Sequence, residues 1–215
     1  MENRKKFDIH YNYYKRNFIF ELKKKMKVTP YKILLGSNSP RRKELLKKMD
    51  IPFKAVTIKA DESYPEILPP SEVPEYLALK KSLAYQDLKK NELLITADTI
   101  VSLKGMILGK PKNKTQAKKM LRMLSGRKHQ VITGVCLRSS KDILTFSDIS
   151  EVHFKDLTAA EIKYYVEKYK PFDKAGAYGI QEWIGLTGIE KIKGSFYNIM
   201  GLPTAKLMKY LKECK

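Results

Sequence analysis

Two adjacent arginines, Arg41 and Arg42, stand where the sequence could bind an anion. They follow a small polar loop and the pair Ser39-Pro40, which is typical of the N-cap and first turn of a helix. Free N–H groups and the positive end of the helix dipole attract anions there, and arginine binds phosphate through two parallel hydrogen bonds. The stretch indicates either a phosphate site or an ordinary strand-to-helix connection with solvated arginines, and alone it does not decide between them.

A carboxylate follows a second apolar run. Asp98 and Thr99 come directly after residues 93–97, which read as a buried strand, and apolar residues resume at Ile100. Open α/β sheets place ligands and catalytic groups at the carboxyl ends of central strands. An aspartate there can instead cap a turn with its own side chain. The apolar neighbours on both sides favour a functional Asp98-Thr99 pair at the end of this strand.

Two acids and a lysine add to these candidates. Asp61 and Glu62 lie just beyond a strand expected at 53–58 and could hold a divalent cation, although adjacent acids on an exposed loop are commoner. A helix expected at 74–88 places Lys81 on its apolar stripe. The lysine side chain then either extends out of that face to solvent or points into a cleft.

Two loops supply further charged groups. Lys110 lies in a Gly-Lys-Pro loop that follows a hairpin turn expected at Lys104-Gly105. Asp173 and Lys174 precede a run of small residues that would let the backbone approach a ligand closely. Both loops are therefore candidates for the wall of a binding site.

The elements that must position these groups fit one α/β domain of this length. Strands are expected at 33–35, 53–58, 93–97, 131–137, 143–154 and 189–193. Helices are expected to begin at Pro40 and Pro74, at Thr115 as an N-cap, at Thr158 in a capping box, and after 201–203, the last one reaching about Glu213.

Composition sets outer limits on the function. The chain has 215 residues, 43% of them apolar, and a formal charge of +20 that points to an anionic partner, although its lysines are spread along the whole chain. Cys136 and Cys214 lie far apart, which argues against a disulfide scaffold or a zinc site and favours the cytoplasm. His129 and His153 lack ligand spacing and are expected to be structural.

Residues 1–27 differ from the rest because aromatic residues are interleaved with basic ones. Such a pattern can contact nucleic acid or membranes. We favour a basic extension outside the fold, since Met26 immediately precedes the first organised segment. The domain is then expected to cover residues 28–215.

Six motifs in this order resemble the Maf family of nucleoside triphosphate pyrophosphatases over residues 31–212. They are Ser37-Asn38-Ser39-Pro40-Arg41-Arg42, Ala97-Asp98-Thr99, Gly109-Lys110-Pro111, Leu124-Ser125-Gly126, the run from Asp173 to Gln181, and Gly201-Leu202-Pro203. The resemblance implies hydrolysis of a nucleoside triphosphate to its monophosphate and pyrophosphate with a divalent metal, Mg²⁺ or Mn²⁺. It also implies a twisted mixed sheet flanked by helices, with two lobes around a deep nucleotide-binding cleft.

Within that family the chain resembles the branch that acts on dTTP and UTP. Arg41, Asp98-Thr99 and Ile180-Gln181 match that branch, whereas a branch acting on 7-methyl-GTP has Trp, Asp-Gln and a glutamate at the matching positions. The resemblance makes Asp98 the proton acceptor and assigns base and sugar specificity to Arg41, Thr99 and Gln181. Glu62 and Asp98 would hold the metal. The phosphate- and substrate-binding positions would be Ser37, Arg42, Lys81, Lys110, Asp173 and Lys174.

Three departures from the family pattern leave alternatives open. Gly36 replaces a usual alanine, Phe196 a usual tyrosine, and Glu182-Trp183 follows Gln181 where glycine is usual. The last change places a charge and a large ring beside the expected base pocket, so a purine, a methylated nucleotide such as 7-methyl-GTP, or a modified pyrimidine nucleotide stays an alternative substrate. Alternatives of another class are a basic nucleic-acid-binding module and a regulator of cell division. A homodimer is expected from the family alone.

Overall fold

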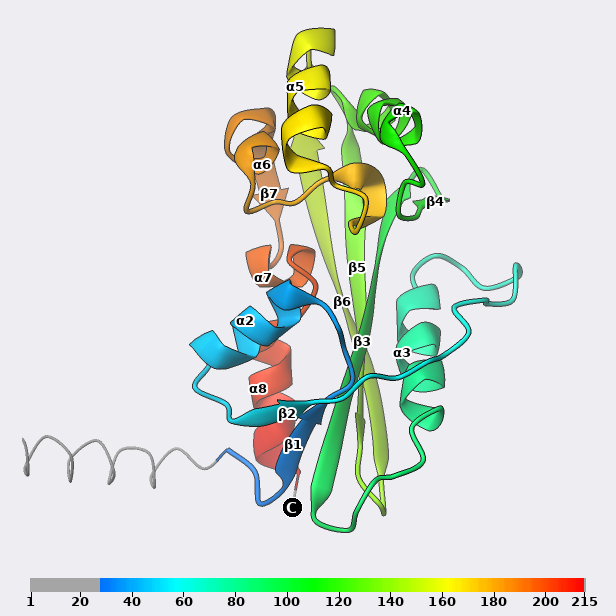
Figure 1. Cartoon of the computed structure of the whole chain (residues 1–215), viewed down its shortest axis with the longest axis vertical. Helices are drawn as coiled ribbons and strands as arrows, with labels where there is room; N and C mark the ends of the chain where they lie inside the picture. The colour runs from blue at the N-terminus through cyan, green and yellow to red at the C-terminus, as the bar shows by residue number, and fades with distance from the viewer. Residues whose placement is uncertain (1–27, 215) are drawn as a thin grey trace, which may run out of the picture. The chain divides into compact units, whose positions relative to one another are not determined.

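The computed structural model describes residues 28–214 (Figure 1), so the basic extension expected at 1–27 lies outside the described residues. The chain divides by its internal contacts into two units. Residues 31–207 form the larger unit, which contains the whole sheet. The described residues of the smaller unit are 28–30 and 208–214, which include the later turns of helix α8 (Thr204–Glu213).

The larger unit is built on a seven-stranded mixed sheet in the order β2-β1-β3-β5-β6-β7, with β4 paired to β3. Strand β1 is parallel to β2 and β3, and every other pairing is antiparallel. The strands are β1 (Lys32–Leu35), β2 (Phe53–Ala55), β3 (Glu92–Leu103), β4 (Met106–Leu108), β5 (Lys128–Arg138), β6 (Ile143–Phe154) and β7 (Ile189–Lys193). The sheet confirms the expected α/β class and mixed topology.

Helices flank this sheet. They are α2 (Pro40–Lys48), α3 (Val73–Leu83), α4 (Lys114–Leu124), α5 (Ala159–Tyr169), α6 (Trp183–Gly188) and α7 (Phe196–Ile199), with a 3₁₀ turn η1 (Ala175–Ala177). Helix α3 packs along β3, β5 and β6, and α4 packs on α5 and η1. In Figure 1 the α4 and α5 pair lies beside one end of the long strands, well away from α3.

Strand β3 is paired along nearly the whole of one side but only at the two ends of the other. One of its edges pairs with β5 continuously from Leu94 to Ser102. Its other edge pairs with β1 only as far as Ile95 and with β4 only from Val101 onward. Among the described residues, no strand covers that edge of 96–100, and the chain leaving β1 turns there into α2. The sheet therefore has a gap beside the middle of β3, between β1 and β4.

The prediction that Asp98 ends a strand is wrong. Asp98 and Thr99 lie in the middle of β3, paired with Gly134 and Thr133 of β5. The apolar run stops at Ala97 because these two side chains are the least buried of the strand from Leu93 onward, while the backbone continues its pairing. Asp98 is consequently held by a sheet ladder and not by a turn.

The close approach of α3 to β5 fixes the height of that helix above the sheet. A Cβ atom added to Gly134 would lie 2.2 Å from the backbone nitrogen of Glu75, so only glycine fits at this crossing. Val73 and Leu77 of the helix pack with Ile100 and Ile132 of the sheet in one buried cluster. Lys81, one turn beyond Leu77, therefore projects from a helix whose position is set by packing.

Most predicted elements are confirmed, with shifted ends. Strands 143–154 and 189–193 have the predicted bounds, and Thr158 forms both hydrogen bonds of a capping box with Glu161. Helix α3 stops at Leu83 and not at 88, and the side-chain amide of Gln86 donates to the Leu83 carbonyl at 2.8 Å beyond that end.

Two further boundaries differ from expectation. Asn113 caps α4 in place of Thr115, since its side chain accepts a hydrogen bond of 2.9 Å from the Gln116 N–H. Strand β2 ends at Ala55 and not at 58. The hairpin turn at Lys104-Gly105 is confirmed, and both of its residues have positive φ.

Candidate active site

A cleft of about 410 Å³ opens beside the gap in the sheet. Its walls come from the loop after β1 and the start of α2, from β3, from Glu62 and Lys81, and from segments around 110, 173–179 and 199–201. All of its lining residues belong to the larger unit. The predicted residues found in the lining are Ser37, Arg41, Arg42, Glu62, Lys81, Asp98, Thr99, Lys110, Asp173 and Lys174.

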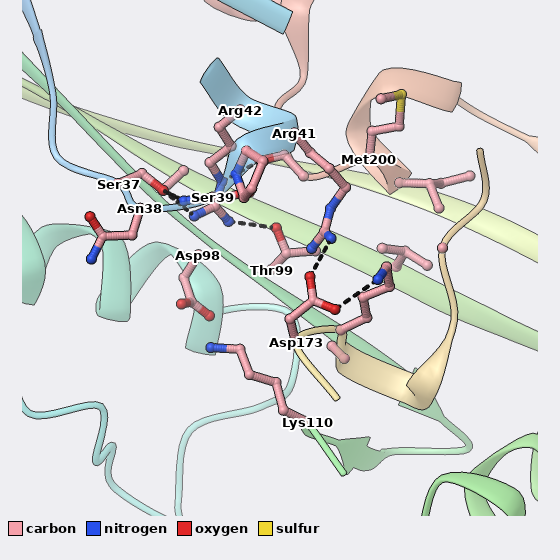
Figure 2. A pocket seen from close by; sticks show the side chains of 18 of the residues that line it. Ser37, Asn38, Ser39, Arg41, Arg42, Asp98, Thr99, Lys110, Asp173 and Met200 are labelled. Atoms are coloured by element: carbon pink, nitrogen blue, oxygen red, sulfur yellow. Dashed lines mark hydrogen bonds and ion pairs between the residues drawn. The ribbon is translucent and has the colours of Figure 1, made fainter. Parts of the chain in front are cut away.

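Asp98 faces a cluster of cations in this cleft. The Lys81 Nζ donates to Asp98 Oδ1 at 2.5 Å and lies 2.9 Å from Glu62 Oε1, and both the Lys81 and Asp98 side chains are mostly buried. Lys110 Nζ lies 4.0 Å from Glu62 Oε2, and Figure 2 shows its ammonium pointing toward Asp98. The sequence left open whether the Lys81 side chain extends to solvent or into a cleft, and in the structure it points into the cleft.

Glu62 is held ionised by these contacts. The hydrogen bond from Lys81 lowers the pKa of the Glu62 carboxyl, and this effect outweighs the partial burial that acts in the opposite direction. Two carboxylates, Asp98 and Glu62, thus converge on one ammonium group. The point where they meet is already a cation position.

The donor set at that position fits a metal that is shared with a substrate. Mg²⁺ and similar ions are often held by one or two carboxylates and complete their coordination with substrate phosphates. Asp98 and Glu62 would supply the two carboxylates. Within residues 28–214, no group of three or more acidic, histidine or cysteine side chains converges as a self-sufficient metal site.

Arg42 joins three segments that are far apart in the sequence. Its Nε donates to the Gly201 carbonyl at 2.8 Å, and its other nitrogens donate to Ser37 Oγ at 3.3 Å and to Thr99 Oγ1 at 3.0 Å (Figure 2). Loss of water around the guanidinium lowers the pKa of Arg42, although the group stays charged at neutral pH. The interpretation of a solvated arginine is therefore wrong for Arg42.

A row of alternating charges forms the opposite wall of the cleft. Arg41 donates to Asp173 Oδ2 at 2.8 Å (Figure 2). The Lys174 ammonium donates to Asp173 Oδ1 at 2.7 Å. Burial would raise the pKa of Asp173, but the hydrogen bonds from Lys174 and Arg41 lower it below its usual value. Asp173 is therefore a carboxylate within a cationic wall, and its expected role in substrate binding stays a prediction.

The expected position of Glu182 and Trp183 beside the base pocket stays a prediction. Neither lines the cleft. The Glu182 carboxylate turns inward and lies 3.0 Å from the Lys174 ammonium, and it also accepts a hydrogen bond from the Tyr165 hydroxyl. Trp183 packs edge-to-face on Tyr164 with ring centroids 5.0 Å apart. These orientations could not be predicted from the local sequence, because Tyr165 and Tyr164 belong to α5.

Gln181 is separated from the other predicted residues. Its side chain is exposed and it is absent from the cleft lining. An apolar part of the lining was not predicted from the sequence, and it includes Ile58, Val101, Val131, Tyr178, Ile199 and Met200. Only Tyr178 had a signal, since it lies in the motif run that ends at Gln181.

The two single histidines lie outside the cleft lining. His129 is buried between Phe154 and Tyr178, and its Nε2 shares a hydrogen bond of 2.8 Å with the Tyr178 hydroxyl. Burial, with a smaller effect of His153, lowers the pKa of His129 to about 4. His129 is therefore a neutral core residue that supports one wall of the cleft from behind.

Comparison with known proteins bears on this arrangement. Residues 32–214 match the family described as Maf-like protein. A Bacteroides thetaiotaomicron protein named dTTP/UTP pyrophosphatase is 53% identical over 185 residues, which cover 85% of this chain and 96% of that protein. A Porphyromonas gingivalis protein of the same name is 52% identical over 187 residues, covering 85% and 94%.

Among solved structures, a HAM1 protein from Coxiella burnetii covers 86% of this chain and 100% of its own, with a TM-score of 0.42 and 16% sequence identity. A likeness at that level carries no argument about activity. Within the described part of the chain, no helix combines the length and apolar character needed to cross a membrane.

Proposed function

The chain belongs to the Maf family, and on that premise we propose that it hydrolyses nucleoside triphosphates to the monophosphate and pyrophosphate, with dTTP and UTP as its preferred substrates. Relatives at about half identity carry the name dTTP/UTP pyrophosphatase. The single observation that supports the reaction most directly is Asp98, a carboxylate fixed on a central strand and surrounded by cations.

The charge of the cleft suits this substrate. Five cationic and three acidic side chains line it, which leaves an excess of two positive charges. A triphosphate bound with one divalent metal ion is a net anion, so the two are complementary. Each cation contributes more once the cleft excludes water, because the effective dielectric falls.

Asp98 would act as the general base. It would take a proton from the water that attacks a phosphorus atom of the triphosphate chain, as a positioned carboxylate can. In the free protein Asp98 is bound to the Lys81 ammonium. Phosphate oxygens of the substrate would compete for the Lys81 ammonium. Once that ammonium had bonded to them, the Asp98 oxygen would be free to accept the proton of the water.

A divalent metal, Mg²⁺ or Mn²⁺, would be held by Asp98 and Glu62. Its contribution would be neutralisation of charge on the phosphate oxygens. Arg42, Lys110 and Lys174 would bind phosphate oxygens directly, in line with the expectation from the resemblance. Arg42 and Ser37 lie at the α2 N-terminus, where backbone N–H groups add to the attraction.

We propose that Arg41, Thr99 and Gln181 determine specificity for the pyrimidine and the sugar. The positions of Arg41 and Thr99 in the cleft support this more directly than that of Gln181. Arg41 lies in the cleft beside Asp173, away from the Asp98 cluster. The Thr99 hydroxyl is bonded to Arg42 and Thr133, so it would act partly by placing Arg42. Gln181 would need the loop around it to move before its amide reached the cleft. A homodimer and a cytoplasmic location stay predictions.

The test is pyrophosphate release from a panel of canonical and modified nucleoside triphosphates, with Mg²⁺, with Mn²⁺ and with EDTA. We expect metal-dependent release that is strongest on dTTP and UTP. Preference for a purine or for 7-methyl-GTP would keep the reaction and refute the specificity. Absence of release from every nucleotide would refute the reaction, and salt-dependent nucleic-acid binding would then be measured.

A further inference from the structure

We propose that Glu182 is a positioning residue of this site, which holds the Lys174 ammonium at the wall of the cleft and is itself held by Tyr165. This inference rests on the proposed function, because it assigns Lys174 to the nucleotide. Glu182 does not line the cleft. Its carboxylate lies 3.0 Å from Lys174 Nζ and accepts the Tyr165 hydroxyl hydrogen bond through its second oxygen.

Burial makes Glu182 the principal partner of this lysine. The Lys174 side chain is only 9% exposed, and a buried ammonium is stable only when it is paired. Its other partner, Asp173, is 56% exposed and is shared with Arg41, whereas Glu182 is 19% exposed. When a nucleotide engages Arg41 and the exposed Asp173, Glu182 is the carboxylate that stays with Lys174.

Helix α5 fixes Glu182 from behind. Tyr165 is fully buried on that helix, and its hydroxyl oxygen also accepts the Gly179 N–H at 3.0 Å. Burial and the adjacent carboxylate raise the pKa of Tyr165, so its hydroxyl stays protonated and donates to Glu182. One phenol thus ties both ends of the 179–182 turn to the helix.

Gly179 packs closely against the Lys174–Glu182 pair. A Cβ atom there would lie 2.8 Å from Glu182 Cδ and 3.0 Å from Lys174 Cε. The backbone of the loop therefore closes directly over the Lys174–Glu182 pair. Lys174 lines the cleft and Glu182 does not, so the pair places its ammonium group, and not its carboxylate, at the cleft wall.

The test is a double-mutant cycle between Glu182→Gln and Lys174→Met. We expect Glu182→Gln, which keeps the shape and the hydrogen bond to Tyr165, to raise KM about tenfold with little change in kcat, the size of one charge-assisted hydrogen bond. In the Lys174→Met background the same substitution should have no further effect on KM. Glu167 lies on α5, as Tyr165 does, and pairs with Lys118 of α4. Glu167→Gln therefore removes a carboxylate from an ion pair outside the cleft lining and serves as the control, with KM unchanged.

A second measurement needs no catalysis. Acetylation of Lys174 by a small reagent, followed by mass spectrometry of its peptide, should be several-fold faster in Glu182→Gln and in Tyr165→Phe than in the unsubstituted protein, because the ammonium has lost its anchor. Equal KM effects in both backgrounds, or unchanged labelling of Lys174, would overturn the role of Glu182. Faster labelling in a protein that turns over no nucleotide would instead refute the proposed function and retain the Lys174–Glu182 coupling.

Discussion

Replacing Asp98 by Asn is the sharpest test of the proposed chemistry, because the substitution changes one atom in a well-supported position. Asp98 is paired on β3 with Gly134 and accepts a hydrogen bond from Lys81. An asparagine oxygen can still accept that bond. The backbone ladder is untouched, so the variant is expected to fold, with a stability loss below about 2 kcal/mol from the weaker hydrogen bond.

Activity should fall far more than stability. General-base catalysis contributes about 10²- to 10⁴-fold, which corresponds to about 3–5 kcal/mol of transition-state stabilisation. Nucleotide affinity without metal should be retained or increased, since one of the three acidic side chains of the cleft loses its charge and the positive excess rises from two to three. The expected signature is therefore a collapse of kcat with intact nucleotide binding.

The assay combines pyrophosphate release under saturating substrate with calorimetric titration of dTTP in EDTA. Asp87→Asn, an exposed residue outside the cleft lining, is the matched control and should leave both quantities unchanged. An Asp98→Asn protein with unchanged kcat would refute the role of Asp98 as base. A parallel loss of turnover and affinity would show that Asp98 serves binding and not proton transfer.

Two further predictions concern the fold around the site. Gly134→Ala should lower the free energy of unfolding by about 3 kcal/mol, because its Cβ would lie 2.2 Å from the backbone of α3, while Gly109→Ala, with nothing within 4 Å, should be nearly neutral. Urea unfolding compares them, and equal midpoints would contradict this packing. His129→Gln should flatten the pH dependence of stability between pH 6.5 and about 4. Across that window the unfolded chain binds a proton that the folded chain rejects, so falling pH removes about 3 kcal/mol of stability. Thermal unfolding at a series of pH values measures this dependence. A slope of stability against pH that is identical in His129→Gln and in the unsubstituted protein would refute the role of His129.

Local patterns in the sequence were sufficient for most strands and for the cations of the cleft. The predicted bounds 143–154 match those of β6, and the Thr158 capping box is a signal confined to four residues. The position of Asp98 within its strand could not be read in this way. Its polar side chain interrupts the apolar run, whereas the pairing that continues the strand comes from β5, more than thirty residues later.

The direction in which a side chain points was the other property that could not be predicted from the sequence. Whether Glu182 points to the cleft, to solvent or to the interior depends on Tyr165, which approaches from another helix. Gln181, its neighbour, carries a stronger motif signal yet is exposed. Motif matching identifies residue types, but the direction of a side chain is decided by packing partners that are distant in the sequence.

The three hydrogen bonds of Arg42 also bear on how the protein matures during synthesis. Ser37 and Thr99 are available early, but the Gly201 carbonyl lies 159 positions after Arg42. Until residue 201 has left the ribosome, a nascent chain can form much of the sheet while Arg42 lacks its backbone acceptor and the cleft lacks the wall made by 199–201. Nucleotide binding should therefore appear only after 199–201 have left the ribosome, when most of the sheet has already formed.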